Sequence, residues 1–331
     1  MSRDGRLRGF RGYGRNALVA ASLTALSLTA SGCVVVHGER VVVPAGTRAE
    51  AAKALRQFTD AYNAADKAYD SSLDAGRVTG ALADIDAARL RAGHATSPAG
   101  NAGHTPLVLT DAKFTIPKKA GWPRWFVADA RGNKGGDARW LLVFTRNSLS
   151  EPWQVAYLTL VAPSAVPAFK KDKDGWAQAV PAGSAAFAVR PADLSKDYAA
   201  YLKSGGRTFA DGPHTSGWRA DRARDARRPG LVRQYIDQPL TSGDYAPLAL
   251  RLADGGALVF FTTHHYEKQT AAPGASVPAQ NKDVQALTEG EVKQSLTLEY
   301  ISNEVALDPA GPGARVSLLG RIQGLTAAQG T

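Results

Sequence analysis

The stretch Thr47–Tyr69, TRAEAAKALRQFTDAYNAADKAY, decides the fold class, because it is a strong helix signal that precedes a strand-rich region. Thr47 and Glu50 fit a capping box, in which each side chain bonds to the backbone of the other residue. Apolar residues then recur at steps of three and four and line one helix face: Leu55, Phe58, Tyr62, Ala65 and Tyr69. We expect this face to pack on a β-sheet.

A meander of strands is predicted after the helices. A second helical stretch runs from about Leu73 to Arg91, and residues 93–106 read as a loop. Strand signals follow, separated by turn-rich segments, at residues 107–116, 125–129, 139–145 and 153–161. Helices followed by a meander predict an α+β module over residues 47–162.

The same order of elements then repeats. Residues 163–192 are rich in Pro, Ala and Lys and are predicted to be a connector. Helices are expected from Asp193 or Ser195 to Lys203 and from Ser216 to Arg228. Strands are expected at residues 231–237, 248–252, 257–266, 294–301 and 314–325. The predicted fold class is therefore α+β, with two modules (47–162 and 193–326), each with helices packed on a curved antiparallel sheet.

The element order of residues 47–162 resembles the cystatin-like and nuclear-transport-factor-like families. In those families a long helix lies in the concave face of a curved antiparallel sheet. The resemblance implies tandem modules of this kind. A local echo supports a duplication, because Ala128-Asp129 and Ala253-Asp254 each precede a glycine-rich turn and a similar apolar strand.

The amino-terminal region has the pattern of an export signal. Residues 1–16 carry five arginines and one aspartate, and residues 17–30 carry no charge. Ala30-Ser31-Gly32-Cys33 then resembles the lipobox of bacterial lipoproteins, with Ala30 where Leu is favoured. This resemblance implies a signal peptide over residues 1–32, a diacylglycerol thioether on Cys33, and acylation of the new amino terminus. Residues 33–46 are predicted to be a short tether.

Two alternatives remain for this region. Residues 17–36 contain no charge and have about the length that a membrane-spanning helix needs, so they could form an uncleaved anchor. A secreted protein with a free thiol at Cys33 is the other alternative. All three readings place residues 38–331 outside the cytoplasm, and lipidation predicts the outer face of the plasma membrane.

Composition narrows the class of protein. The chain has 40 Lys+Arg and 30 Asp+Glu, and loss of residues 1–32 removes five arginines and one aspartate. The resulting mild basic excess does not indicate a nucleic-acid partner. Cys33 is the single cysteine, so no intramolecular disulfide can form. The Ala-rich, Arg-preferring composition and the lipobox together resemble uncharacterised lipoproteins of streptomycetes.

No catalytic, metal or cofactor motif stands out. The six histidines lack metal-ligand spacing, and adjacent His264 and His265 point to opposite faces of a predicted strand. The chain has no G-x-S-x-G elbow. We therefore predict no cofactor and no metal, and we favour a binding or interaction protein over an enzyme. The alternative is a cell-envelope hydrolase whose site is assembled from scattered residues, such as a pair of carboxylates.

The densest positive charge lies between residues 219 and 233. We predict that its arginines bind an anionic envelope polymer or lipid headgroups: Arg219, Arg222, Arg224, Arg227 and Arg228. The alternative is a solvated helix, since Asp221–Arg224 and Asp225–Arg228 have the spacing of local ion pairs. An aromatic cluster is expected either to form the core or to line a groove: Trp122, Trp125, Phe126, Trp140 and Trp153. The protein partner is unknown.

Overall fold

Helix α1 (Arg48–Ala68) begins at the predicted capping box. In the computed structural model, which describes residues 41–331, the Glu50 amide donates to Thr47 Oγ1 over 3.1 Å and the Thr47 amide donates to Glu50 Oε2 over 2.7 Å. The helix ends at Tyr69, whose backbone is left-handed with φ 54°. Leu55 and Phe58 are buried, as their spacing predicted. Residues 1–32 and Cys33 lie outside the described residues.

Helix α2 (Gly80–Thr96) begins later than the predicted start at Leu73, so that boundary was wrong. The residues before α2 form a short 3-10 turn and a bridge to the smaller sheet instead of a helix. Asp70 accepts from the Ser72 amide over 2.9 Å, which starts a short 3-10 turn (η2, Ser71–Leu73). Val78 then forms a bridge with Val155, so the chain between Asp74 and Thr79 follows the neighbouring sheet.

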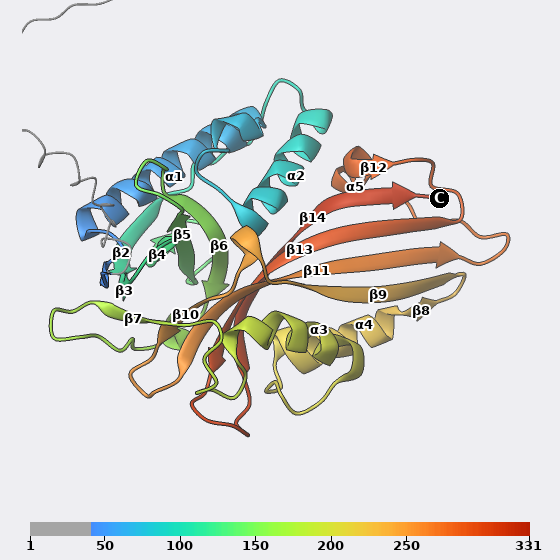
Figure 1. The fold of residues 1–331 in the computed structure, drawn as a ribbon. Coiled ribbons are helices and arrows are strands. Elements are labelled where there is room, and N and C mark those ends of the chain that lie inside the picture. The colour runs from blue at the N-terminus through green and yellow to red at the C-terminus, as the bar shows by residue number, and fades with distance from the viewer. Residues whose placement is uncertain (1–40) are drawn as a thin grey trace, which may run out of the picture. The chain divides into compact units, whose positions relative to one another are not determined.

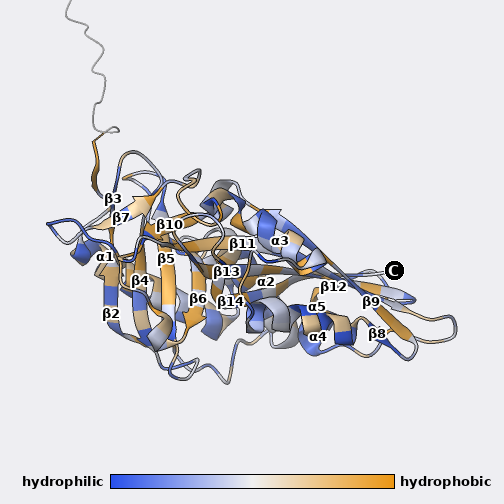
Figure 2. Cartoon of the chain, turned by 90° about the horizontal axis from the view of Figure 1, so that it is seen from below, coloured by the Kyte–Doolittle hydropathy of each residue, from blue (hydrophilic) through white to orange (hydrophobic). Residues whose placement is uncertain are grey.

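The predicted meander forms a four-stranded antiparallel sheet in the order β2 (Leu109–Thr115), β4 (Arg124–Gly132), β5 (Arg139–Arg146) and β6 (Gln154–Val161). Alternate side chains reach opposite faces of this sheet. One face packs against α1, with Phe126 and Phe144 stacked at 4.7 Å beside Phe58. The other face, which includes Trp125, packs against the second sheet. Figure 1 shows α1 over the smaller sheet, and Figure 2 shows the hydrophobic character of β5 and β6.

The larger sheet has a long central part. Its order is β1 (Val43–Pro44), β3 (Pro117–Lys119), β7 (Ala177–Val180), β10 (Leu248–Arg251), β11 (Ala257–Ala271), β13 (Ser295–Asp308), β14 (Ser317–Gly330) and β12 (Thr288–Glu289). Strand β9 (Leu231–Leu240) pairs with β11 beyond the part that β10 occupies, and β8 (Arg227–Arg228) pairs with β9. Strands β11 and β13 are longer than predicted.

Helices cover this sheet. Helix α3 (Leu194–Ser204) packs Tyr198 against Phe261 of β11. A π-turn (Pro213–Gly217) leads into α4 (Trp218–Asp225). The predicted helix to Arg228 was too long, because Pro229 disfavours helical backbone before it and Arg227–Arg228 pair with Leu231–Val232 instead. Short helical elements complete the chain: η3 (Pro163–Ala165), η4 (Pro191–Asp193), η6 (Gly243–Tyr245) and α5 (Lys282–Leu287).

Residues 39–331 form one compact unit of mixed α and β structure. Within it, β1 and β3 join the larger sheet through β7, and α2 packs on β14 and α5. The division into modules 47–162 and 193–326, with a connector at 163–192, stays a prediction. None of the helices between residues 41 and 331 is long and apolar enough to span a membrane.

Candidate functional site

A cleft lies between α2 and β14, and we call it the α2 cleft. Its volume is about 390 Å³, which is within the range of small-molecule sites. The lining comes from α1, α2, β5, β6, α5 and β14: Tyr62, Leu82, Ile85, Asp86, Arg89, Ala92, Trp140, Leu158, Asp283, Leu287, Ile322, Gln323, Gly324 and Leu325. The cleft therefore brings together residues from both ends of the sequence.

Close packing of α2 on β14 sets the walls of the α2 cleft. Gly324 has no side chain, and a Cβ at that position would lie 2.4 Å from Ile85 Cγ2. Leu287 of α5 packs with Ala88 and Ala92 of α2, so α5 also packs against α2. Most of the lining is apolar, which suits the burial of an apolar ligand.

A charged cluster forms the polar part of the cleft. Arg89 Nε and Nη2 donate to Asp86 Oδ1 over 3.1 and 2.8 Å, and Arg89 Nη1 donates to Asp66. His104 Nδ1 lies 2.8 Å from the other oxygen of Asp66. The Arg89 guanidinium is 5.5 Å from the centre of the Tyr62 ring. Arg89 is thus engaged on both sides by carboxylates, and its charge is compensated inside the protein.

Asp74 supplies a second buried carboxyl group next to Asp86. Asp74 is 1% exposed, and burial, followed by the hydrogen bond and charge of Asp86, raises the pKa of Asp74 to about 8. Asp74 therefore holds a proton at neutral pH. Burial also acts to raise the pKa of Asp66, but hydrogen bonds from Arg89 and His104 outweigh it and lower that pKa. With Asp283 at the rim, the cleft has an excess of negative charge.

A buried polar network lies on another part of the sheet, under α4. Arg222 donates to both oxygens of Asp237, over 2.7 and 2.9 Å. His265 Nδ1 bonds to Asp237, and His265 Nε2 lies 2.5 Å from Ser302 Oγ. His265 Nδ1 therefore faces a carboxylate, and His265 Nε2 lies within hydrogen-bond distance of the hydroxyls of both Ser302 and Thr263. Thr263 donates to Glu304 over 2.7 Å.

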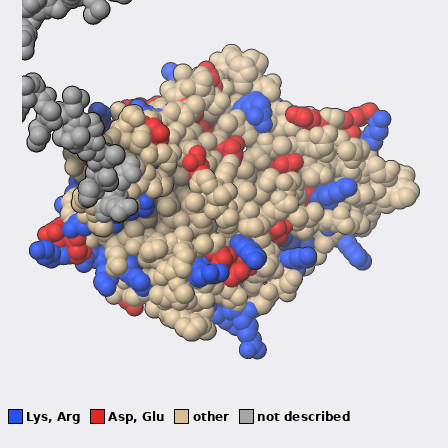
Figure 3. All heavy atoms as spheres, viewed as in Figure 1, with Lys and Arg blue, Asp and Glu red and all other residues tan. Residues whose placement is uncertain are grey.

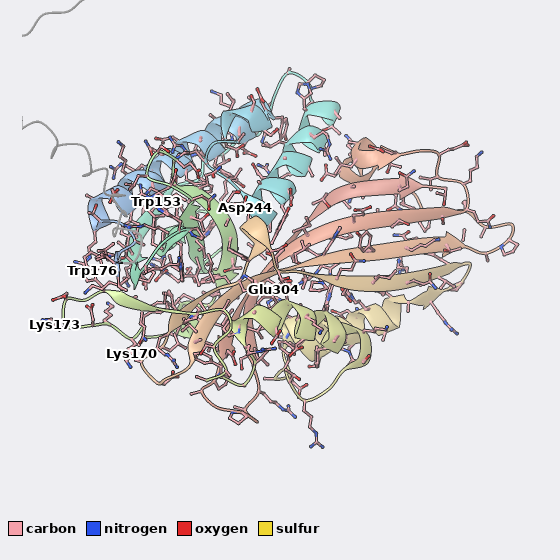
Figure 4. The ribbon with its side chains drawn as sticks, in the orientation of Figure 1. Trp153, Lys170, Lys173, Trp176, Asp244 and Glu304 are labelled. Atoms are coloured by element: carbon pink, nitrogen blue, oxygen red, sulfur yellow. The ribbon has the colours of Figure 1, made fainter. Side chains whose placement is uncertain are left out.

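This order of Ser302, His265 and Asp237 resembles the hydrogen-bond chain of serine hydrolases. Its surroundings do not suit that chemistry. Ser302 is 0% exposed and His265 is 2% exposed, and the cavity beside His265 has a volume of about 50 Å³. Such a space holds water and not a substrate. We interpret the network as the packing contact between α4 and the sheet; its member Glu304 is labelled in Figure 4.

The five predicted arginines lie in different surroundings. Arg222 is buried and paired with Asp237, between the rings of Trp218 and Tyr235. Arg219 donates to the Leu202 carbonyl and lies over the ring of Tyr201. Of the five predicted arginines, the three at the end of α4 and in β8 face solvent: Arg224, Arg227 and Arg228.

Two of these exposed arginines form the predicted local ion pairs. Arg224 bonds to Asp221 over 2.8 Å and Arg228 to Asp225 over 2.6 Å, which confirms those pairs. Arg227 is exposed and has no ion pair among residues 41–331. Anion binding by this set stays a prediction.

A groove of about 640 Å³ runs between β2 and the segment 163–171. The charged groups beside it bond to one another. Arg139 Nε donates to Asp129 over 2.6 Å and Arg139 Nη1 donates to Asp111 over 2.7 Å. The α2 cleft is the better candidate, because it is lined mainly by apolar side chains. Within the described part of the chain, no group of three or more His, Cys, Asp or Glu side chains could hold a metal.

The aromatic cluster mainly forms the core. Trp125, Phe126, Trp140 and Trp153 are buried, and Trp140 also lines the α2 cleft. The sequence did not reveal Asp74, Asp86 and Arg89 as site residues. An Asp86–Arg89 spacing was available as a signal, but it is typical of solvated helix faces as well.

The chain defines a mixed α+β protein with a concave site between a helix pair and a sheet. It belongs to the family described as domain of unknown function DUF8094, whose match covers residues 42–330. An uncharacterised lipoprotein of Streptomyces coelicolor is 69% identical over 330 residues, and one of Streptomyces avermitilis is 63% identical over 332 residues, each covering 100% of both chains. A second uncharacterised lipoprotein of Streptomyces coelicolor is 27% identical over 61% of this chain and 59% of its own. No solved structure matches the chain.

Proposed function

We propose that this chain is a lipid-anchored binding protein at the outer face of the plasma membrane, which holds a small molecule in the α2 cleft. The observation that carries the binding role is the cleft itself, with its apolar walls and buried Asp86. The full-length relatives named lipoproteins support the anchor, because the run Ala30-Ser31-Gly32-Cys33 supplies a lipid-attachment cysteine.

The charge of the cleft selects the ligand class. Arg89 is engaged by Asp66 and Asp86, and Asp283 adds an exposed carboxylate at the rim. The net negative charge of the cleft would repel an anionic ligand and attract a cationic one, and it would not repel a neutral one. The proposed ligand therefore has an apolar body and a neutral or cationic polar end.

Dye binding tests this role. We expect the chain to bind the neutral dye Nile red with a single saturable site, and a cationic apolar dye more tightly than the anionic 1-anilinonaphthalene-8-sulfonate. Ile322→Trp should weaken Nile red binding about tenfold by filling the cleft, because Ile322 lines it and lies on the same face of β14 as Gly324, which contacts Ile85. Gln329→Trp lies on the same strand outside the lining and is the matched control.

A charge change tests the second part of this role. Asp283→Arg should weaken binding of the cationic dye roughly 30-fold, since it replaces an attraction with a repulsion and each charge at about 4 Å in water contributes about 1 kcal/mol. Asp60→Arg, an exposed change on α1 outside the lining, should leave it unchanged. Equal binding by all these variants would place the dyes elsewhere and overturn the cleft as the site.

The anchor has its own test. In cells that express the tagged chain with an alkyne-labelled fatty acid, we expect label on the intact chain and none on Cys33→Ser. External protease should digest the chain in intact cells. Unlabelled intact chain in the culture medium would favour the secreted alternative. Labelling that is independent of Cys33 would contradict the lipid site.

A cell-envelope hydrolase is the second candidate function. It is favoured by the pair Asp74 and Asp86, since Asp74 retains a proton at neutral pH and Asp86 lines the cleft. A neutral carboxyl beside a carboxylate is the arrangement of an acid–base pair. Release of soluble fragments from labelled cell walls, abolished by Asp86→Asn, would support this function over ligand binding alone.

Two finer parts of the proposal concern the arginines and the modules. Anion binding would fall to the exposed Arg224, Arg227 and Arg228 on α4 and β8. The cystatin-like arrangement is supported by α1, which packs on the face of the smaller sheet. Crosslinking in intact cells would identify a protein partner.

A further inference from the structure

The point at which the described chain begins is close to a strongly basic surface. Val43 of β1 pairs with Lys119 of β3, and Pro44 pairs with Lys118. Strand β3 pairs in turn with β7. Val41 and Val42 precede β1 and are 51% and 61% exposed.

The length of the tether limits how far a lipid on Cys33 can be from this surface. Seven residues lie between Cys33 and Val41, so the two are eight chain steps apart. An extended chain spans at most about 3.6 Å per residue, so the reach is roughly 30 Å or less. A bilayer that holds the lipid must therefore lie close to the end of the domain that carries β1, β3 and β7.

This end is rich in cations that lack acidic partners. We define the basic face by Arg48, Lys119, Arg124, Lys170, Lys171 and Lys173. None of the six has an ion pair among residues 41–331, while nearby Asp172 and Asp174 are both bonded to Lys118, over 2.6 and 3.2 Å. Burial and the charge of Arg124 lower the pKa of Lys119, as expected where positive charge is crowded. Lys and Arg side chains are visible at this end in Figure 3, and Lys170 and Lys173 are labelled in Figure 4.

Two tryptophans accompany these cations. Arg124 lies 4.9 Å from the Trp122 ring centre, and Arg48 lies 5.9 Å from that of Trp176. Both rings are half-buried, so each presents part of an amphipathic indole to the surface. Trp beside Lys and Arg is the side-chain combination that prefers the boundary between lipid headgroups and acyl chains.

We propose that the basic face rests on anionic phospholipid headgroups of the bilayer that holds the lipid on Cys33. The positive face complements the negative charge of such a bilayer, and the short tether keeps the two within contact distance. Lipid and basic face then act as two membrane signals, which together hold a protein more stably than one. Figures 1 and 2 show α4 and β8 far from β3 and β7, so the α4 arginines belong to elements distant from this membrane contact.

Vesicle binding by a chain without lipid tests the proposal. Residues 33–331 with Cys33→Ser should be used, because the compact unit and its hydrophobic clusters lie within residues 39–331. We expect cosedimentation with vesicles of 30% phosphatidylglycerol in phosphatidylcholine, little with pure phosphatidylcholine, and weaker binding at 0.5 M salt than at 0.05 M, as screening requires.

Matched charge-removal variants locate the contact. Lys170→Gln, Lys171→Gln and Lys173→Gln combined should weaken binding roughly 100-fold, since each basic residue near a surface contributes about fivefold. Arg224→Gln, Arg227→Gln and Arg228→Gln combined remove the same charge from α4 and β8 and should leave binding unchanged. Both triple variants change exposed side chains, and equal melting temperatures would verify their folding.

Several results would overturn the proposal. These are equal binding to neutral and anionic vesicles, loss of binding with the arginine triple and not the lysine triple, or no binding by the unaltered chain at low salt. Binding to isolated cell walls without binding to vesicles would assign the basic face to a wall polymer instead.

Discussion

Arg222 on α4 donates two hydrogen bonds to the carboxylate of Asp237 on β9, and both side chains are less than 10% exposed. The Trp218 and Tyr235 rings each lie 4.9 Å from the same guanidinium. Burial acts to raise the pKa of Asp237, but hydrogen bonds from His265 and Arg222 outweigh it and keep that pKa low. The pair ties α4 to the sheet, and it removes Arg222 from any surface role.

Loss of Arg222 should therefore destabilise the fold. Arg222→Met leaves Asp237 as a buried charge without its main partner, and we expect a cost of about 3–5 kcal/mol in the free energy of unfolding. Arg224→Met, an exposed change on the same helix, should cost less than about 1 kcal/mol. Urea denaturation followed by circular dichroism measures both. Equal stability of the two variants would show that the pair does not hold α4.

The Asp74–Asp86 pair predicts a pH dependence of stability. The pKa of Asp74 is raised in the folded state to about 8 from an ordinary value of 3.8, so the folded chain binds the extra proton between these values. Stability should therefore fall as pH rises from about 4 to 8, with a slope of at most about 1.4 kcal/mol per pH unit from this group.

Asp74→Asn isolates that contribution. The amide cannot lose a proton, so the stability of the variant relative to the unaltered chain should increase as pH rises through this window. Urea denaturation at pH 5 and pH 8 measures the difference. Asp66 has a lowered pKa and titrates below this range, so it does not contribute to the change. A difference that is constant with pH would contradict the raised pKa.

The contact between Gly324 and Ile85 predicts an energetic coupling. Gly324→Ala would place a methyl group 2.4 Å from Ile85 Cγ2, so α2 or β14 must shift. We expect a loss of about 1–3 kcal/mol of stability from this overpacking. In Ile85→Ala the space is open, and adding Gly324→Ala should cost much less. A double-mutant cycle measured by thermal unfolding gives the coupling, and additive effects would indicate that the helix does not pack as closely as described.

The capping box predicts a smaller effect. Thr47→Ala removes the hydroxyl that accepts from the Glu50 amide, and it should lower stability by about 1 kcal/mol. Thr47→Ser keeps that acceptor and should be nearly neutral. Thermal unfolding of the three proteins side by side measures the difference. If serine and alanine were equally destabilising, loss of the methyl group and not of the hydrogen bond would be the cause.

The sequence by itself determined the local elements where the pattern is set by neighbours along the chain. The capping box at Thr47, the buried face of α1 and the strands of the meander depend on contacts three or four residues apart, or on alternation. Element ends that depend on tertiary partners were missed, as at Leu73, where Val78 pairs with Val155 instead of continuing a helix.

Only the tertiary structure decided the candidate sites. The α2 cleft combines Tyr62 with Leu325, and the basic face combines Arg48 with Lys173, although these residues are far apart in sequence. The burial of Arg222 likewise depends on Asp237, which reaches it from a different element. Burial and charge pairing depend on which elements meet in space, and a run of residue types records only what is adjacent along the chain.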